Sequence, residues 1–284
     1  MPLVNLREVL DWAKERNVAV PAFNIDNIDI AQSLMMAAEE ERKPIILAVG
    51  QGAIRIGRLE LLAGVVKTLA AGSSLPVVLH LDHGASFEQT LACIRAGFTS
   101  VMFDGSPLPL AENIAQSVLV VRAAHAVGVS VETELGAIPG TEDGIAHSGP
   151  AKVSLSDVEA FIHAVDTDAL AVSIGNAHGM YKTTPRLDME LLQKIRDLNA
   201  EVPHLVLHGG SGLGDGVIRT AVSNGIRKIN VATEIRLAYL EGLRSAEGSQ
   251  DIYAHIAAAQ DSIMEIARAK IRLFTTKTGE RGKL

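Results

Sequence analysis

Eight short runs rich in β-branched and other apolar residues recur along the chain, and amphipathic segments of helical period separate them. Apolar strands joined by helical crossovers indicate a parallel sheet covered by helices, and eight such units close a (β/α)8 barrel. The sequence therefore predicts this α/β barrel, with a doubly wound open sheet as the alternative. The runs are VAVPAFNI from Val18, PIILAVG from Pro44, PVVLHLD from Pro76, SVMFD from Ser100, VSVETEL from Val129, ALAVSIG from Ala169, HLVLHGG from His204 and KINVAT from Lys228.

The residues available for a core support this class. The chain is 48% hydrophobic but only 4% aromatic, so its core must consist of Ala, Val, Ile and Leu. No Pro/Gly/Ser-rich linker divides the 284 residues, and we expect one domain over residues 1–284. The barrel should span about residues 18–245, after a helix around Leu6 to Arg16. A helical extension should cover about residues 250–276, with its amphipathic stretch from Ile252 to Phe274 packed on the barrel or on another subunit.

Charge and cysteine content disfavour several classes of protein. The net charge of −7 comes without a clustered basic stripe, so a nucleic acid is not an expected partner. No apolar run approaches the roughly 18 residues that span a bilayer, and we expect no membrane role. The lone Cys93 cannot form an internal disulfide, and the N-terminal segment has no signal-peptide pattern. We therefore expect a cytoplasmic protein.

Polar side chains that a buried strand should avoid gather at the C-terminal ends of the expected strands. In a barrel these ends form one face, where active sites sit, so several strands would contribute to one concave polar site. A single strand-end Asp or His more often caps a helix or binds a loop carbonyl, but coincidence on so many strand ends is much less common. The residues are Asn24, Asp82, His83, Asp104, Glu132, Glu134, Asn176, His178, His208, Ser211, Asn230 and Thr233.

Three of the nine histidines, His83, His178 and His208, come just after expected strands. Three neutral imidazoles from separate strands suit a borderline-soft metal such as zinc and leave coordination positions open for substrate oxygens. They therefore predict a catalytic metal site. We expect structural roles for the other six, of which His125, His163 and His255 fall in helical stretches, His147 in a loop, His80 within a strand and His204 at the opposite end of the barrel.

Small and polar residues follow the last two expected strands. Gly209, Gly210, Ser211 and Gly212 come directly after the seventh, and residues 230–233 after the eighth. Loops in these positions, with N–H groups at a helix start, form a phosphate site in many barrels. We therefore expect a phosphate ester as substrate. The alternative is that HGGSGLG is only a flexible turn.

Seven motifs together resemble the class II, metal-dependent fructose-bisphosphate and tagatose-bisphosphate aldolases, especially the bacterial tagatose-type branch. The resemblance implies reversible aldol cleavage of a phosphorylated ketose without a Schiff base, which yields dihydroxyacetone phosphate and an aldehyde such as glyceraldehyde 3-phosphate. We also expect a homo-oligomer, either a dimer or a tetramer. The motifs span nearly the whole chain: AVPAFNI from Ala19, HLDHG from His80, MFDGSPLPLAENI from Met102, ETELG from Glu132, SIGNAHGMY from Ser173, HGGSGL from His208 and INVATE from Ile229.

Carried over residue by residue, the resemblance gives roles to these positions. Asp82 matches the acid/base at the C4 hydroxyl, and Glu142 matches the residue that exchanges a proton at the carbon next to the ketone. The zinc ligands are matched by His83, His178 and His208, and the carboxylates of a second or alternative divalent site by Asp104 and Glu134. The dihydroxyacetone phosphate pocket, where a monovalent cation (Na+ or K+) often assists, is matched by Gly179, Gly209, Gly210, Ser211, Asn230, Val231, Ala232 and Thr233. Asn24 is also expected to bind the substrate.

The departures from the family pattern concern the substrate. Pro139 stands where relatives usually carry Gly, Pro107 where many carry His, and SQDIYAHIAAAQDS lacks the Asp-Pro-Arg run common in the tagatose branch. An aldolase for a different phosphorylated sugar or sugar acid is therefore one alternative. A catalytically silent sugar-phosphate-binding subunit is another, although it should have lost metal ligands. A barrel for metal-assisted hydrolysis or isomerisation would explain the histidines but not the joint presence of the motifs.

Overall fold

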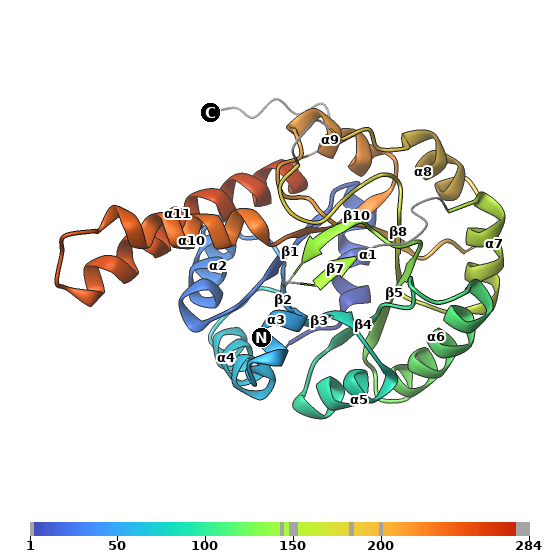
Figure 1. Ribbon diagram of the computed structural model, residues 1–284, viewed down its shortest axis with the longest axis horizontal. Helices are drawn as coiled ribbons and strands as arrows, with labels where there is room; N and C mark the ends of the chain where they lie inside the picture. The colour runs from blue at the N-terminus through green and yellow to red at the C-terminus, as the bar shows by residue number, and fades with distance from the viewer. Residues whose placement is uncertain (1–2, 143–144, 148–152, 182–184, 199–200, 277–284) are drawn as a thin grey trace.

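The chain folds into a closed barrel of eight parallel strands surrounded by helices (Figure 1). A computed structural model describes residues 3–142, 145–147, 153–181, 185–198 and 201–276. The predicted barrel is confirmed and the open-sheet alternative is wrong, because the first strand pairs with the last. In order around the barrel, the strands are β1 (Val20–Asn24), β10 (Ile226–Val231), β9 (His204–Leu207), β8 (Ala169–Val172), β5 (Ser130–Leu135), β4 (Ser100–Phe103), β3 (Val77–Gly84) and β2 (Ile45–Val49).

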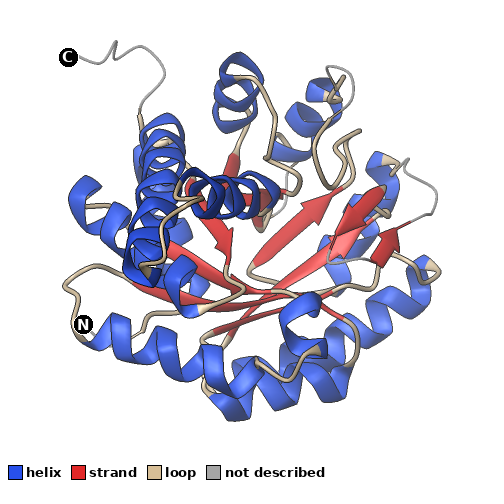
Figure 2. Ribbon diagram, turned by 60° about the vertical axis from the view of Figure 1, so that its left-hand side comes forward, coloured by secondary structure: helices blue, strands red, loops and turns tan. Residues whose placement is uncertain are grey.

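Helices alternate with these strands and cover the outside of the barrel (Figure 2). Polar side chains start several of them: Asn27 Oδ1 accepts from the Ile30 N–H and Ser86 Oγ accepts from the Gln89 N–H, which satisfies donors at the helix starts. The helices are α1 (Leu6–Arg16), α2 (Ile28–Glu41), α3 (Gln51–Arg55), α4 (Leu59–Ala71), α5 (Phe87–Ala96), α6 (Leu110–His125), α7 (Leu155–Ala164), α8 (Met189–Arg196), α9 (Asp215–Ser223), α10 (Thr233–Ser245) and α11 (Ile252–Thr275).

A short antiparallel pair, β6 (Gly140–Glu142) and β7 (Ile145–His147), follows β5. The expectation of a loop that includes His147 was wrong here. The segment GAIPGTEDG lacks the alternation of apolar and polar residues by which a strand is recognised. Its start is held instead by a distant loop, since the His178 N–H donates to the Pro139 carbonyl at 2.8 Å and Gly140 bridges to His178.

The barrel interior is apolar near its N-terminal end and polar further along the strands. Inward residues such as Val78 and Ala171 pack with Leu6 and Leu10 of α1, which closes the N-terminal end of the barrel. The expected N-terminal helix is thereby confirmed. Further along, the inward positions carry His80, Glu132 and Lys228, all fully buried. The interior therefore leads from an apolar plug to a polar layer directly beneath the C-terminal face.

Helices α10 and α11 form a hairpin that projects beyond the barrel (Figure 1). They approach closely at Gly242, where an added Cβ would lie 2.5 Å from the Ala258 carbonyl oxygen. Towards its end α11 packs on the barrel side, where the Phe274 carbonyl accepts from the Ala19 N–H and Arg268 binds Glu40 of α2. The predicted C-terminal helix is confirmed. No helix within the described residues is both long and apolar enough to cross a membrane.

Candidate active site

Asp82 and His83 are neighbours in β3, yet both side chains belong to the group of polar side chains at the C-terminal end of the barrel. Adjacent residues of a regular strand point to opposite faces. Here the register of β3 against β4 shifts between Leu81 and Gly84, and His83 has a φ of 49°, in the left-handed region. Such irregularities often re-aim side chains next to active sites. Only glycine fits at Gly84, because a Cβ there would lie 2.2 Å from the Met102 carbonyl oxygen.

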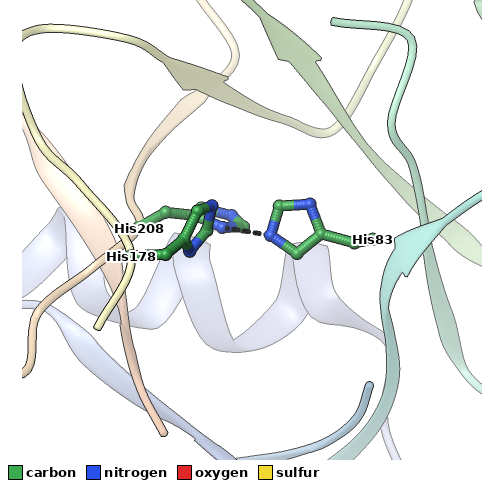
Figure 3. A group of neighbouring side chains, drawn as sticks. All are labelled: His83, His178 and His208. Atoms are coloured by element: carbon green, nitrogen blue, oxygen red, sulfur yellow. Dashed lines mark hydrogen bonds between the residues drawn. The ribbon is translucent and has the colours of Figure 1, made fainter. Parts of the chain in front are cut away.

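The side chains of His83, His178 and His208 converge at this end of the barrel (Figure 3). Their ring centroids are 4.8 to 6.0 Å apart and the rings meet edge to face. One ring nitrogen of each lies within 4.8 Å of one on the others. Each imidazole comes from a different strand end, and together they offer three nitrogen lone pairs to one point. This donor set suits a metal such as zinc.

Carboxylates behind two of these rings fix which nitrogen faces the shared point. His83 Nδ1 lies 2.8 Å from Asp104 Oδ2, and His208 Nε2 lies 2.8 Å from Glu132 Oε1. The opposite ring nitrogens, His83 Nε2 and His208 Nδ1, then lie 3.0 Å apart. Burial lowers the pKa of His208, which favours the neutral imidazole that a metal requires. Carboxylates in this position usually orient metal-binding imidazoles.

His83 also belongs to a second group of possible ligands, together with Asp104 and Glu134. Burial and the nearby Asp104 charge raise the pKa of Glu134 well above its ordinary value. Burial alone would also raise the pKa of Asp104, but hydrogen bonds from His83 and Ser106 hold it below its ordinary value. A cation would offset the repulsion between two carboxylates in such a buried place. The residues therefore fit a divalent ion here as well.

Two asparagine amides hold the Asp82 carboxylate. Asn24 Nδ2 donates to Asp82 Oδ2 at 2.8 Å, and Asn230 Nδ2 donates to Oδ1 at 3.0 Å. All three side chains are buried. Asn230 was expected in the dihydroxyacetone phosphate pocket and Asn24 to bind substrate, and in this structure the amide groups of both contact Asp82. The carboxylate is therefore fixed in orientation next to His83.

The loop after β9 runs close to its neighbours through glycines. Gly209 has a φ of 70°, and an added Cβ would lie 2.0 Å from the Ala177 carbonyl oxygen. The Gly210 N–H donates to the Asn230 carbonyl at 2.8 Å, which ties this loop to the end of β10. Gly179, beside His178, also has a positive φ of 89°. Gly209 and Gly179 therefore need glycine for its backbone freedom.

The same loop reaches the start of α10. The Gly212 N–H donates to Glu234 Oε1 at 3.0 Å, and the Glu234 N–H donates to Ser211 Oγ at 3.3 Å. Val231 ends β10, Ala232 follows it, and Thr233 is the first residue of α10. The residues expected to hold phosphate thus lie together at a helix N-terminus, an arrangement that favours anions.

The remaining sequence expectations fall elsewhere. Glu142 ends β6, but its side chain lies outside the described part of the structure. Asn176 supports the site, because its Nδ2 donates to the His208 carbonyl. Five of the histidines given structural roles contact other groups: His80 with Ser100, His125 with Asp168, His163 with the Glu159 carbonyl, His204 with Asp11 and His255 with the Leu243 carbonyl.

Sequence reasoning missed Lys228 as a residue of the site. It was assigned only to a strand, whereas its ammonium group is fully buried and contacts Glu132 and Asn230. Lysine is almost never fully buried unless it is paired. The signal that could have found it is a lysine inside an expected inner strand, two residues before a polar strand end.

Comparison with known proteins agrees with this geometry. The family model described as "Fructose-bisphosphate aldolase class-II" matches residues 4–279. A fructose-bisphosphate aldolase of Geobacillus stearothermophilus is 40% identical over 96% of this chain and 97% of its own length. A probable fructose-bisphosphate aldolase of Bacillus subtilis is 38% identical over 96% of this chain and 98% of its own length.

Solved structures are similar over the same extent. The YdjI aldolase from Escherichia coli K12 superposes with a TM-score of 0.85 at 31% identity, over 96% of this chain and 97% of that one. A putative fructose-1,6-biphosphate aldolase from Coccidioides immitis gives a TM-score of 0.88 at 27% identity, over 95% of this chain and 96% of that one. The barrel, the histidine cluster and these matches agree, and the chain belongs to the class II fructose-bisphosphate aldolase family of carbon–carbon lyases.

Proposed function

We propose that the protein is a zinc-dependent ketose-bisphosphate aldolase. It would cleave tagatose 1,6-bisphosphate or fructose 1,6-bisphosphate reversibly to dihydroxyacetone phosphate and an aldehyde such as glyceraldehyde 3-phosphate. The observation that carries the proposal is the convergence of three imidazoles beside the fixed Asp82 carboxylate. The names of the curated relatives favour the fructose isomer, while the tagatose isomer rests on the motifs of the sequence.

His83, His178 and His208 would hold the zinc ion. A bound divalent cation acts as a Lewis acid that stabilises negative charge on substrate oxygens. Asp104 and Glu134, with His83, would hold a second divalent ion or an alternative position of the same ion. The mutual repulsion of these carboxylates supports that role, since a cation would relieve it.

Asp82 would act as the acid/base at the C4 hydroxyl. Breaking the C3–C4 bond towards the aldehyde requires removal of the hydroxyl proton, and a carboxylate is a suitable acceptor. The two amide donors fix the orientation of this carboxylate. It can therefore meet the substrate without occupying a coordination position on the metal.

Glu142 would exchange the proton at the carbon next to the ketone of dihydroxyacetone phosphate. Its support is the match of GTEDG to the family's loop and the attachment of the start of β6 to His178. Because Gly140 bridges to a proposed zinc ligand, the β6 strand begins at the edge of the site. A base on this segment would approach the substrate from the loop after β5.

The loops after β9 and β10 would bind the phosphate of the three-carbon fragment. Gly209 and Ser211 would supply backbone N–H groups and a hydroxyl, while Gly210 would hold the loop beside residues 230–233 through its N–H bond to the Asn230 carbonyl. Residues 230–233 lead into α10. Asn24, Asn230 and Gly179 border the same region in this proposal. A monovalent cation, Na+ or K+, would assist the phosphate there.

A different phosphorylated sugar or sugar acid is the second candidate, because Pro107 and Pro139 depart from the family pattern. The deciding experiment is a panel of phosphorylated ketoses assayed for release of dihydroxyacetone phosphate. Fastest turnover of a ketose 1,6-bisphosphate supports the proposal. Release of pyruvate or of an unphosphorylated three-carbon ketone in place of dihydroxyacetone phosphate contradicts it.

We also propose that the enzyme is a cytoplasmic homo-oligomer, either a dimer or a tetramer. Large apolar side chains are exposed on the projecting hairpin, among them Leu237, Leu240, Ile252 and Tyr253. Exposed apolar surface of this kind is typical of a protein–protein contact. Sedimentation of the native enzyme measures its mass directly, and a monomer at micromolar concentration contradicts this part of the proposal.

A further inference from the structure

Lys228 is a fully buried charge in the polar layer beneath the candidate active site. Its Nζ lies 2.8 Å from Glu132 Oε2 and 3.1 Å from Glu132 Oε1, and it donates to Asn230 Oδ1 at 2.7 Å. An ammonium group has three N–H donors, and three acceptor atoms surround this one. Burying such a group is costly, and a site that keeps it must satisfy it fully.

The Glu132 side of this arrangement leads to the histidine cluster. Glu132 Oε1, which contacts Lys228, also lies 2.8 Å from His208 Nε2. That contact leaves His208 Nδ1 to face His83. Lys228 neutralises the carboxylate that orients this ring.

The Asn230 side leads to the proposed acid/base. Asn230 Oδ1 accepts from Lys228, so Nδ2 of the same amide is directed away and donates to Asp82 Oδ1. A reversed amide would turn its N–H groups towards the ammonium and its oxygen towards the carboxylate. Both contacts would then be repulsive, in a buried place where electrostatic interactions are strong. Lys228 therefore permits only one of the two amide orientations.

We propose that Lys228 is a positioning residue for catalysis, which holds the Asn230 amide in the orientation that fixes Asp82. This inference rests on the proposed aldolase function and on the acid/base role of Asp82 within it. Lys228 touches neither substrate nor metal in this account. Lys228 acts on the reaction through the Asn230 amide. Its ion pair with Glu132 stabilises the buried charge of both groups in the barrel interior.

A purely structural role predicts a different result. If Lys228 serves only as the counter-ion of Glu132, its removal destabilises the fold by leaving a buried carboxylate unpaired. Replacing both partners by neutral residues should then restore both the stability of the fold and kcat for cleavage. The variant Lys228→Met/Glu132→Gln separates the two roles, because it contains no buried unpaired charge and the amide oxygen that replaces the carboxylate can still accept from His208 Nε2. The control Glu132→Gln keeps the Lys228 contact to Asn230. It leaves the buried ammonium without its counter-ion, so the free energy of unfolding of both variants is measured beside their activity.

The test compares two reactions in these variants, both loaded with zinc. Cleavage of the best ketose bisphosphate depends on Asp82, whereas proton exchange into dihydroxyacetone phosphate does not require the C4 hydroxyl. We expect the double variant to lose about 10- to 100-fold in kcat for cleavage, the size of effect that a small misplacement of a catalytic group produces. Its proton exchange and zinc content should stay close to those of Glu132→Gln.

Equal kcat for cleavage in the double variant and in Glu132→Gln would overturn the inference, and so would an equal loss of cleavage and exchange. Asn230→Ala keeps the ion pair and serves where the double variant does not fold. Because Asn230 also borders the proposed dihydroxyacetone phosphate pocket, its substitution is judged at saturating substrate. Its kcat for cleavage should fall by a larger factor than its kcat for exchange, and unchanged cleavage would also overturn the inference. A parent enzyme that releases no dihydroxyacetone phosphate from any ketose contradicts the proposed function instead, so the two failures are distinguishable.

Discussion

His83 Nε2 and His208 Nδ1 lie 3.0 Å apart at the C-terminal end of the barrel, with a carboxylate in contact with the other nitrogen of each ring. Two imidazole nitrogens held this close can share a proton or a cation. The nearby His178 ring adds a third nitrogen. Three convergent nitrogens suit a metal ligand set, and the first prediction tests whether a metal is bound.

The isolated enzyme should contain about one tightly held divalent ion per chain, most readily zinc, because three neutral imidazoles form its ligand set. Chelation should abolish cleavage, and added zinc should restore it. Metal analysis of His208→Ala should show a large loss of zinc, whereas the control His204→Ala, at the opposite end of the barrel, should retain it. Full activity after verified metal removal, or a Schiff base trapped by borohydride, would contradict this.

Substitution of Asp82 by Ala or Asn should lower kcat for cleavage by roughly 10²- to 10⁴-fold, the usual contribution of a positioned acid/base. Zinc content should remain near that of the parent, since Asp82 contacts Asn24 and Asn230 and is absent from both groups of possible metal ligands. Steady-state kinetics and metal analysis of the same preparations check both points. Loss of zinc would instead assign Asp82 to the support of the metal site.

Glu142→Ala should strongly slow detritiation of dihydroxyacetone phosphate, because the proposed base for that carbon is removed. Asp82→Ala should keep much of this exchange, since its proton belongs to the C4 hydroxyl of the full sugar. When both reactions are measured, Glu142→Ala should therefore lose exchange, whereas Asp82→Ala should lose cleavage and keep much of its exchange. An exchange rate in Glu142→Ala equal to that of the parent would move the role to another residue, with Glu132 the next to test.

Stability should depend on pH through His80. Burial, reinforced by the Lys228 charge, lowers the pKa of His80 from 6.5 to about 3. Between these values the unfolded chain binds a proton that the folded chain excludes, so this histidine makes the free energy of unfolding fall as the pH falls. The slope from one such group reaches about 1.4 kcal/mol per pH unit.

Denaturant unfolding of His80→Gln at several pH values between 4 and 6.5 measures this contribution. Its free energy of unfolding should change less steeply with pH than that of the parent. The control His163→Gln replaces an exposed histidine of α7 and should follow the parent. If the free energies of unfolding of the parent and of His80→Gln change with pH in parallel, His80 is not the source of the pH dependence.

Local patterns in the sequence were enough to predict the barrel and the residue types of its site. The eight apolar runs between amphipathic segments each overlap one barrel strand, since buried parallel strands require continuous apolar residues. The helix predicted around Leu6 to Arg16 is found with these bounds, and a capping box of Asn5 and Glu8 stabilises its start. His83, His178 and His208 could be singled out because polar residues at strand ends of a barrel share one face.

Only the tertiary structure decided how these residues are held. The left-handed backbone at His83 depends on the shifted register with β4 and on the close approach at Gly84, which local propensity does not encode. The β6–β7 pair starts on a backbone contact with His178, a residue distant in sequence. Lys228 contacts Glu132, 96 residues away, in the closed interior. A sequence shows which side chains can be charged, but the cost of burying a charge, and the partners that offset it, exist only once the barrel has closed.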